Sequence, residues 1–230
     1  MGLSATSRAR AVPGVRRVAL VAVGALVLGL SACGDEPAPE EAGSAPAASE
    51  VSSPASSQDD RPVADRFIAS KDLPGTWRDS EPPGPGFKQL VCGVDIEPQK
   101  PVDGGAIRFS QGGLGPFLAQ HVRIHSDATT PAAVVRDLKA SLPGCTSYET
   151  KGNRADSPTV RFDVEPVEVK GLPANAVAWR QTATTGAGPT TDMVLMSDDH
   201  ALIALTSYAL KGHPDPQVLE DAVGAFDRTE

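Results

Sequence analysis

The sequence predicts an α+β domain in which two main helices pack on a largely antiparallel sheet. Alternating polar and apolar residues indicate strands, and these strands come in runs interrupted by two helical patterns, without the strict alternation of a parallel α/β fold. The sequence SDDHA at 197–201 joins the last two strand patterns as a hairpin, a connection that antiparallel strands use. The predicted domain covers residues 64–230, which is the length of a single domain.

The first part of this domain contains a short helix, a long loop and two strands. Residues 65–73 are predicted as a short helix, and the proline- and glycine-rich residues 74–91 as a loop. The two strands, 106–110 and 117–125, flank the turn sequence QGGLGP.

A longer helix is predicted after the second strand. Thr130 and Pro131 are residue types typical of a helix N-cap and first turn, and Pro143 followed by Gly144 ends the helix. Its apolar face would carry Val134, Val135, Leu138 and Leu142.

Four further strands and a last helix complete the domain. Trp179 shares a strand face with Val177, which favours a place in the core, and Asp215 with Pro216 predicts the start of the last helix. The strand patterns cover 159–164, 176–182, 193–197 and 201–207. The buried face of the helix would carry Leu219, Ala222, Val223 and Phe226.

The start of the chain has the features of a bacterial lipoprotein signal. Arginines precede the uncharged apolar run 18–30, and Leu30-Ser31-Ala32-Cys33 resembles a lipobox, whose cysteine is acylated before the chain is cut in front of it. The run is too short to span a bilayer as a helix, which needs about 20 residues. We expect residues 1–32 to be a lipoprotein signal peptide and Cys33 to be the lipidation site. Export through the Sec or the twin-arginine route and an ordinary cleaved signal are alternatives that the sequence leaves open.

Residues 33–63 are predicted to be the acylated cysteine followed by a disordered tether. The segment is rich in Pro, Ala, Ser and Glu and cannot bury enough apolar surface to offset the entropy lost on ordering. The chain has a formal net charge of −8 and no basic stripe in the domain, which excludes nucleic acid as an expected partner.

Cys92 and Cys145 are the two cysteines of the predicted domain. In an exported protein such a pair predicts a disulfide. Two isolated thiols with no CxxC motif supply too few ligands for a metal, and redox-active pairs lie closer together in the sequence. We therefore expect one structural disulfide, no metal and no cofactor.

Several segments, taken in order, resemble a known family. They are DLPGTW at 72–77, VCGVDIEP at 91–98, AQHVRIH at 119–125, PAAVVRDLKASLPGC at 131–145 and GLPANAVAWR at 171–180. Together they resemble the actinobacterial sensor-domain lipoproteins, which are similar to the PknH-like extracellular domain of a mycobacterial serine/threonine kinase. The resemblance covers about residues 66–228. It implies an antiparallel sheet with two helices, a surface cleft for a ligand, and a disulfide between Cys92 and Cys145. The kinase version has two disulfides, whereas this chain has cysteines for one.

Histidines and carboxylates offer weaker candidates for chemistry. His121 and His125 have the HxxxH spacing of helical zinc sites, but on a strand such positions lie about 13 Å apart, so we interpret them as two solvent-facing residues. The sequence GGLG at 112–115 is interpreted as a hairpin loop rather than a phosphate cradle, since Pro116 and a strand follow it. The acidic pairs are interpreted as solvated; they are Asp95 with Glu97 and Asp163 with Glu165.

Trp77 and Phe87 are the candidate ligand contacts. Trp77 lies in the proline-glycine loop, where a large ring either packs on the core or lines a groove. The sequence contains no GxSxG elbow, and His200 and His213 show no nucleophile partner. We therefore expect no enzyme but a lipoprotein, anchored on the outer face of the cell membrane, with a sensor-like domain that binds an envelope ligand or protein. A structural or assembly lipoprotein without a small ligand, and a hydrolase with dispersed catalytic residues, are the alternatives.

Overall fold

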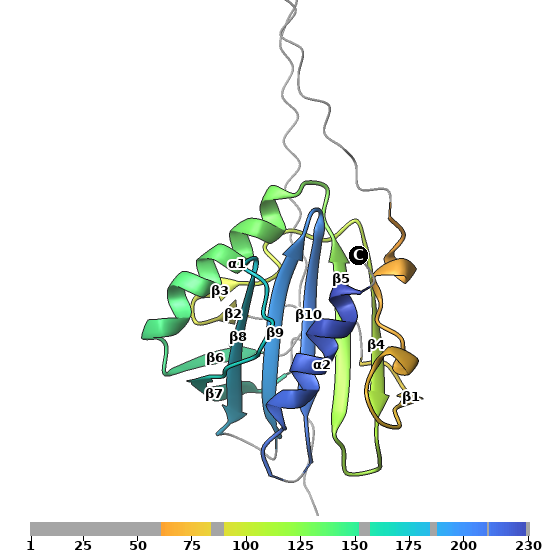
Figure 1. Cartoon of the computed structure of the whole chain (residues 1–230). Coiled ribbons are helices and arrows are strands. Elements are labelled where there is room, and N and C mark those ends of the chain that lie inside the picture. The colour runs from red at the N-terminus through yellow and green to blue at the C-terminus, as the bar shows by residue number, and fades with distance from the viewer. Residues whose placement is uncertain (1–60, 84–89, 152–156, 185–187, 211, 229–230) are drawn as a thin grey trace, which may run out of the picture. The chain divides into compact units, whose positions relative to one another are not determined.

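An antiparallel sheet dominates the computed structural model, which describes residues 61–83, 90–151, 157–184, 188–210 and 212–228 (Figure 1). Within the described residues eight strands form this sheet in the order β1-β4-β5-β10-β9-β8-β7-β6, and two more form a hairpin. The strands of the sheet are β1 (Arg78–Ser80), β4 (Asp103–Ser110), β5 (Phe117–Ile124), β6 (Ser147–Lys151), β7 (Thr159–Pro166), β8 (Ala176–Ala183), β9 (Thr190–Asp198) and β10 (Ala201–Tyr208). The hairpin consists of β2 (Leu90–Val91) and β3 (Val94–Asp95).

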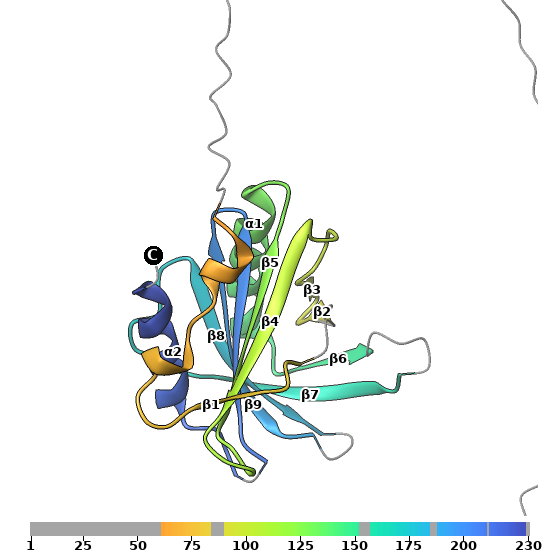
Figure 2. The same ribbon diagram turned by 90° about the vertical axis from the view of Figure 1, so that its right-hand side faces the viewer.

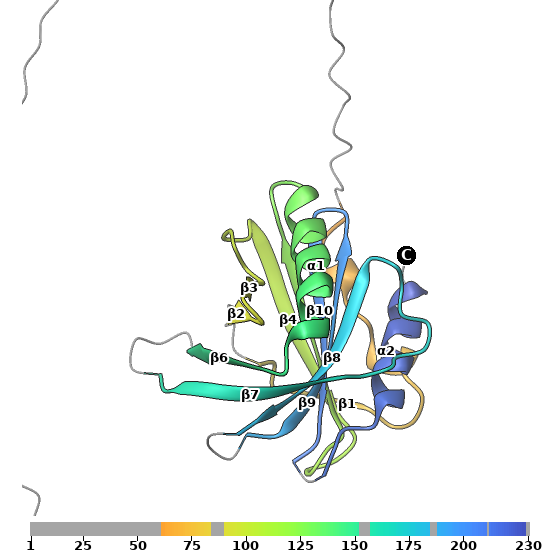
Figure 3. The same cartoon turned by 90° about the vertical axis from the view of Figure 1, so that its left-hand side faces the viewer.

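The two helices, α1 (Thr129–Ser141) and α2 (Pro216–Asp227), pack on opposite faces of the sheet (Figures 2 and 3). Successive residues of a strand point to opposite faces, and β9 contributes to both. Met193 and Leu195 belong to the apolar cluster that contains α1, and Val194 and Met196 to the cluster that contains α2. The continuous apolar sequence of β9 therefore reflects burial on both sides, and the predicted α+β class is confirmed.

Most of the predicted elements are present; β5 ends one residue earlier than predicted, and the other predicted strands are longer than the sequence indicated. The final helix begins as predicted: the Asp215 side chain accepts a hydrogen bond from the Gln217 N–H, and Pro216 follows it. The cap predicted for α1 is wrong. Thr130 lies inside the helix, and the Asp127 carboxylate accepts hydrogen bonds from its backbone N–H and hydroxyl and from the Thr129 hydroxyl. Asp127 thus satisfies a backbone donor in the first turn of α1, the N–H of Thr130.

The segment predicted as a short helix consists of two 3₁₀ turns, Val63–Arg66 and Ser70–Asp72. The fully buried side chain of Gln120 fixes the chain between them, because it accepts from the Ile68 N–H and donates to the Arg66 carbonyl. Asp198, at the end of β9, pairs with the guanidinium groups of Arg61 and Arg66. These contacts attach the start of the described domain to the strands β5 and β9.

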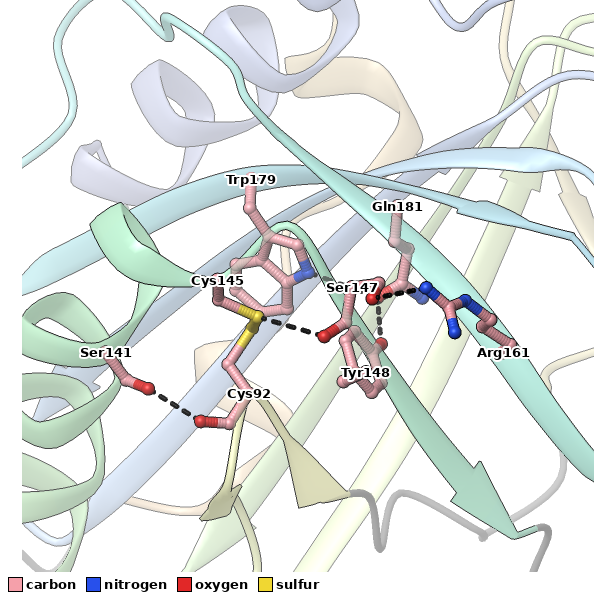
Figure 4. Close-up of a disulfide and its surroundings, with 8 residues drawn as sticks. All are labelled: Cys92, Ser141, Cys145, Ser147, Tyr148, Arg161, Trp179 and Gln181. Atoms are coloured by element: carbon pink, nitrogen blue, oxygen red, sulfur yellow. Dashed lines mark hydrogen bonds between the residues drawn. A yellow bond between two sulfur atoms is a disulfide. The ribbon is translucent and has the colours of Figure 1, made fainter.

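The predicted disulfide between Cys92 and Cys145 is confirmed, with 5.8 Å between the two Cα atoms (Figure 4). It joins the β2–β3 hairpin to the segment between α1 and β6. Cys92 packs against the apolar cluster of α1, which also contains the buried Trp179. The Ser141 hydroxyl, at the last residue of α1, donates a hydrogen bond to the Cys92 carbonyl at 2.6 Å. The hairpin is therefore held by a covalent bond, a hydrogen bond and apolar packing.

Candidate functional site

Four strand ends meet at one end of the sheet, where the β4–β5 turn and the β10–α2 connection lie together (Figures 1 and 2). The register pairs Arg78 with Ser110, and Phe117 with both Ser110 and Tyr208. The residues just outside these positions therefore converge; they are Trp77, Gln111, Pro116 and Ala209. With the first turns of α2 they line a surface pocket of about 500 Å³, which we call the Trp77 pocket. The rest of its described lining is Leu114, Gly115, His213, Pro214, Asp215, Gln217, Val218 and Asp221.

Trp77 forms an apolar wall of this pocket. Its side chain is half-buried and packs against the core cluster that contains α2. Its Nε1–H donates a hydrogen bond to the Pro74 carbonyl at 2.9 Å. Because the only polar atom of the indole is already bonded, the part of the ring that borders the pocket offers carbon surface. Trp77 thus packs on the core and also lines a groove, whereas Phe87 lies outside the described residues.

The polar side of the pocket comes from the first turns of α2. Asp215 Oδ1 accepts from the Gln217 N–H at 3.0 Å, and the Gln217 side-chain amide donates to Asp221 Oδ1 at 2.9 Å. The described residues give no hydrogen bond to the second oxygen of either carboxylate, so each can accept from a ligand. Among the described lining residues none is a lysine or arginine. The arrangement therefore favours hydroxyl or amine donors over phosphate or carboxylate groups.

His213 lies in the same pocket as the two carboxylates, which is the arrangement that would raise the hydrolase alternative. Its side chain is exposed, and the described residues form no hydrogen bond with its ring. A general base is normally oriented by a hydrogen bond to a partner. The pocket thus contains a histidine and two carboxylates, but no described residue orients the His213 ring as a general base.

The sequence interpretation of His121 and His125 as solvent-facing is wrong. Both are buried, with exposed fractions of 7% and 2%. His121 lies on the face of β5 that points toward α1, because its cross-strand partner Ala204 belongs to the apolar cluster that contains α1, and His125 follows the last residue of the strand. Burial, together with the positive charge of Arg123, lowers the pKa of His121 to about 4. Burial also lowers the pKa of His125, and Arg123 adds to this effect while Asp127 opposes it.

Arg123, between these histidines on β5, borders a second surface pocket of about 530 Å³. Its guanidinium forms an ion pair with Glu97 at 3.5 Å and donates to the backbone carbonyls of Val122 and Gly105. Gly104, its cross-strand partner, leaves room for this side chain, since a Cβ there would stand 3.2 Å from the Nη1 atom of Arg123. The charge of Arg123 is thus compensated within the fold.

Metal ligands are not gathered anywhere in the described part of the chain: no three His, Cys, Asp or Glu side chains there are placed to hold an ion. Asp163 and Glu165 are exposed, as predicted for solvated acids. Asp95 and Glu97 are less solvated than predicted, since both are partly buried; Asp95 accepts a hydrogen bond from the Glu97 N–H, and Glu97 pairs with Arg123. Within the same residues, no helix is long and apolar enough to cross a membrane.

Comparison with known proteins gives a structural neighbour. The crystal structure of the extracellular domain of PknH from Mycobacterium tuberculosis is similar, with a TM-score of 0.44 and 12% sequence identity, over 71% of this chain and 98% of that one. No protein-family model and no curated protein matches the sequence. Membership of the PknH-like family therefore remains a prediction, and no site residue is transferred from the neighbour.

Sequence reasoning found Trp77 but missed the polar residues opposite it. Asp215 was assigned only to the start of a helix and Gln111 only to a turn, and Gln217 and Asp221 were not considered. The strand register brings them to Trp77, and the pairing of β5 with β10 joins segments that are distant in the sequence. The sequence shows the turn QGGLGP and the segment after β10 as separate features. Only the pairing of β5 with β10 places the two segments next to each other.

Proposed function

We propose that this protein is an extracytoplasmic lipoprotein, anchored through Cys33, whose domain binds a ligand in the Trp77 pocket without transforming it. The basic start, the apolar run and the lipobox-like sequence support export and acylation. Two acyl chains give firm membrane attachment, where one chain binds only marginally. The disulfide supports an oxidising compartment, since such bonds are rare in the cytosol.

The observation that carries the binding role is the composition of the Trp77 pocket. The indole of Trp77, fixed by a hydrogen bond, forms an apolar wall of the pocket. The polar lining includes Asp215 and Asp221, each with one carboxylate oxygen that has no described partner and can accept a hydrogen bond from a ligand. Small-molecule sites combine apolar walls with a few polar groups that set orientation. The exposed His213 ring, with no bond to either carboxylate among the described residues, favours binding over catalysis.

Two other functions have an observation in their favour. Leu114 and Leu210 are large apolar residues with exposed fractions of 68% and 58%, and the Leu210 N–H donates to the Leu114 carbonyl. This apolar pair beside the pocket would suit docking on another envelope protein. The presence of His213 with Asp215 and Asp221 would suit a hydrolase.

Native mass spectrometry tests the proposal. The full chain, purified in detergent, is exposed to a lipid and cell-wall extract and then transferred to the spectrometer. The proposal expects an adduct of unchanged ligand mass that is lost on denaturation and is absent from a Trp77→Leu variant. A bare protein mass would contradict small-ligand binding and favour the assembly function. A ligand recovered as cleaved fragments would favour the hydrolase.

A further inference from the structure

We infer that the Trp77 pocket accepts a sugar ring of a neutral glycan. The inference rests on the proposed function and names the chemical class of its ligand. A pyranose ring has a face of C–H groups and a periphery of hydroxyls, so it needs a flat apolar surface on one side and mixed hydrogen-bonding groups on the other.

Trp77 supplies the apolar surface. Its Nε1–H is occupied by the Pro74 carbonyl, so a ligand meets carbon atoms of the ring rather than a competing donor. The packing of the indole against the α2 cluster holds the ring in place and limits the entropy lost when a ligand binds. Pro116 and Pro214, which also line the pocket, extend this rigid apolar surface.

The polar lining fits hydroxyl groups better than a cationic or anionic ligand. Asp215 and Asp221 each keep one carboxylate oxygen without a described partner, and the Gln111 side-chain amide makes no hydrogen bond to a described residue. Carboxylates accept only, whereas an amide both donates and accepts. A hydroxyl satisfies both kinds of group. An ammonium ion would leave the amide donor unmatched, and an anion would face two carboxylates with no described basic residue in the lining.

The test uses the full chain in detergent and four neutral tetrasaccharides, made of glucose, N-acetylglucosamine, galactose or mannose. Binding is measured by isothermal titration calorimetry and by tryptophan emission. The sequence has two tryptophans, and Trp179 has an exposed fraction of 1%, so a ligand-induced change in emission reports Trp77. Spermidine serves as the cationic probe.

The inference expects that at least one tetrasaccharide binds and changes the emission. Trp77→Leu, which keeps an apolar side chain on the core, should weaken this binding by about tenfold or more, the value of a lost aromatic contact. Asp221→Asn should weaken it several-fold. Asp137→Asn, an exposed carboxylate on α1, is the matched control and should leave the affinity unchanged.

Three results would overturn the inference. Binding of none of the four saccharides contradicts the ligand class, and saccharide binding that Trp77→Leu leaves unchanged contradicts the site. Trp77-dependent binding of spermidine alone would identify a cationic ligand instead. Failure of the proposed function is a separate result: in the native mass spectrometry experiment, no component of the extract would bind the protein at all.

Discussion

Polar side chains are buried along one face of β5, at positions where the sequence pattern predicted contact with solvent. His121 and Arg123 occupy alternate positions of this strand and His125 follows its last residue, and the exposed fractions of all three are below 10%. Arg123 is compensated by Glu97 and by backbone carbonyls. Both ring nitrogens of His125 are buried without a hydrogen bond to a described residue. Burial disfavours the charged form of both imidazoles, and protonation would also place additional positive charge beside Arg123, so both effects lower their pKa.

The buried His121 predicts that the protein loses stability in mild acid. Its pKa is lowered to about 4 in the folded protein from 6.5, so the unfolded chain binds a proton that the folded protein rejects between these values. Stability is therefore complete above pH 6.5 and falls as the pH decreases toward 4. At pH 5 the loss relative to pH 8 is about 2 kcal/mol from this group, and His125 acts in the same direction.

Urea denaturation of the His121→Leu variant between pH 8 and pH 5 checks this prediction. The variant should lose less stability over this range than the unmutated protein, because the proton linkage of residue 121 is absent. His213→Asn changes an exposed histidine and should keep the original dependence. Equal slopes for the His121→Leu variant and the unmutated protein would show that His121 titrates normally in the fold.

The β2–β3 hairpin is a short element that a disulfide links to the rest of the domain. Each of its strands has two residues, and an isolated hairpin of this size is not stable in water. The disulfide links it across a sequence separation of 53 residues. Restricting a loop of that length in the unfolded chain is worth about 4 kcal/mol on the chain-entropy model.

Replacing Cys145 by Ser should lower the free energy of unfolding by about that amount. Guanidinium denaturation under oxidising conditions measures it, and thiol titration should find one new thiol, from Cys92. The double variant Cys92→Ser with Cys145→Ser separates the loss of the bond from the effect of a free thiol. If both variants unfold within 1 kcal/mol of the unmutated protein, the bond contributes little to stability.

The elements that the sequence predicted well are those whose signals are local. The start of α2 follows from Asp215 and Pro216, and the β9–β10 hairpin from SDDHA at 197–201. The strands β1, β2, β3 and β6 were missed because they have two to five residues, too few to show a period of alternation. Their pairing comes from tertiary contacts.

The candidate site was less predictable than the fold for the same reason. Trp77 is a rare aromatic residue in a loop, and its sequence context predicted that the ring either packs on the core or lines a groove. The residues that face it belong to a turn and a helix more than thirty positions away, and they meet it only through the β1–β4–β5–β10 register. For His121 the alternation of the strand was predicted correctly, but the predicted solvent exposure was wrong because its face of the sheet is covered.

At the scale of the whole molecule, one helix covers each face of the sheet, and an apolar cluster lies between each helix and the sheet. The chain carries a formal net charge of −8, which gives no electrostatic attraction to anionic headgroups. We propose that attachment to a membrane depends on a covalent lipid. The lipobox-like Leu30-Ser31-Ala32-Cys33 lies outside the described residues, and we propose that it supplies such an anchor.

Replacing Cys33 by Ala should abolish acylation, because in our proposal the lipid is attached to the sulfur atom of this cysteine. In a bacterial host fed an alkyne analogue of palmitate, the unmutated chain should carry the label and partition into detergent, and the Cys33→Ala variant should carry none. The double variant Cys92→Ser with Cys145→Ser should stay labelled, since those sulfurs form the disulfide and are not acylated. Label on the Cys33→Ala variant would show that another residue is modified. Absence of label from the unmutated chain would leave an ordinary cleaved signal, and the domain would then be released rather than tethered.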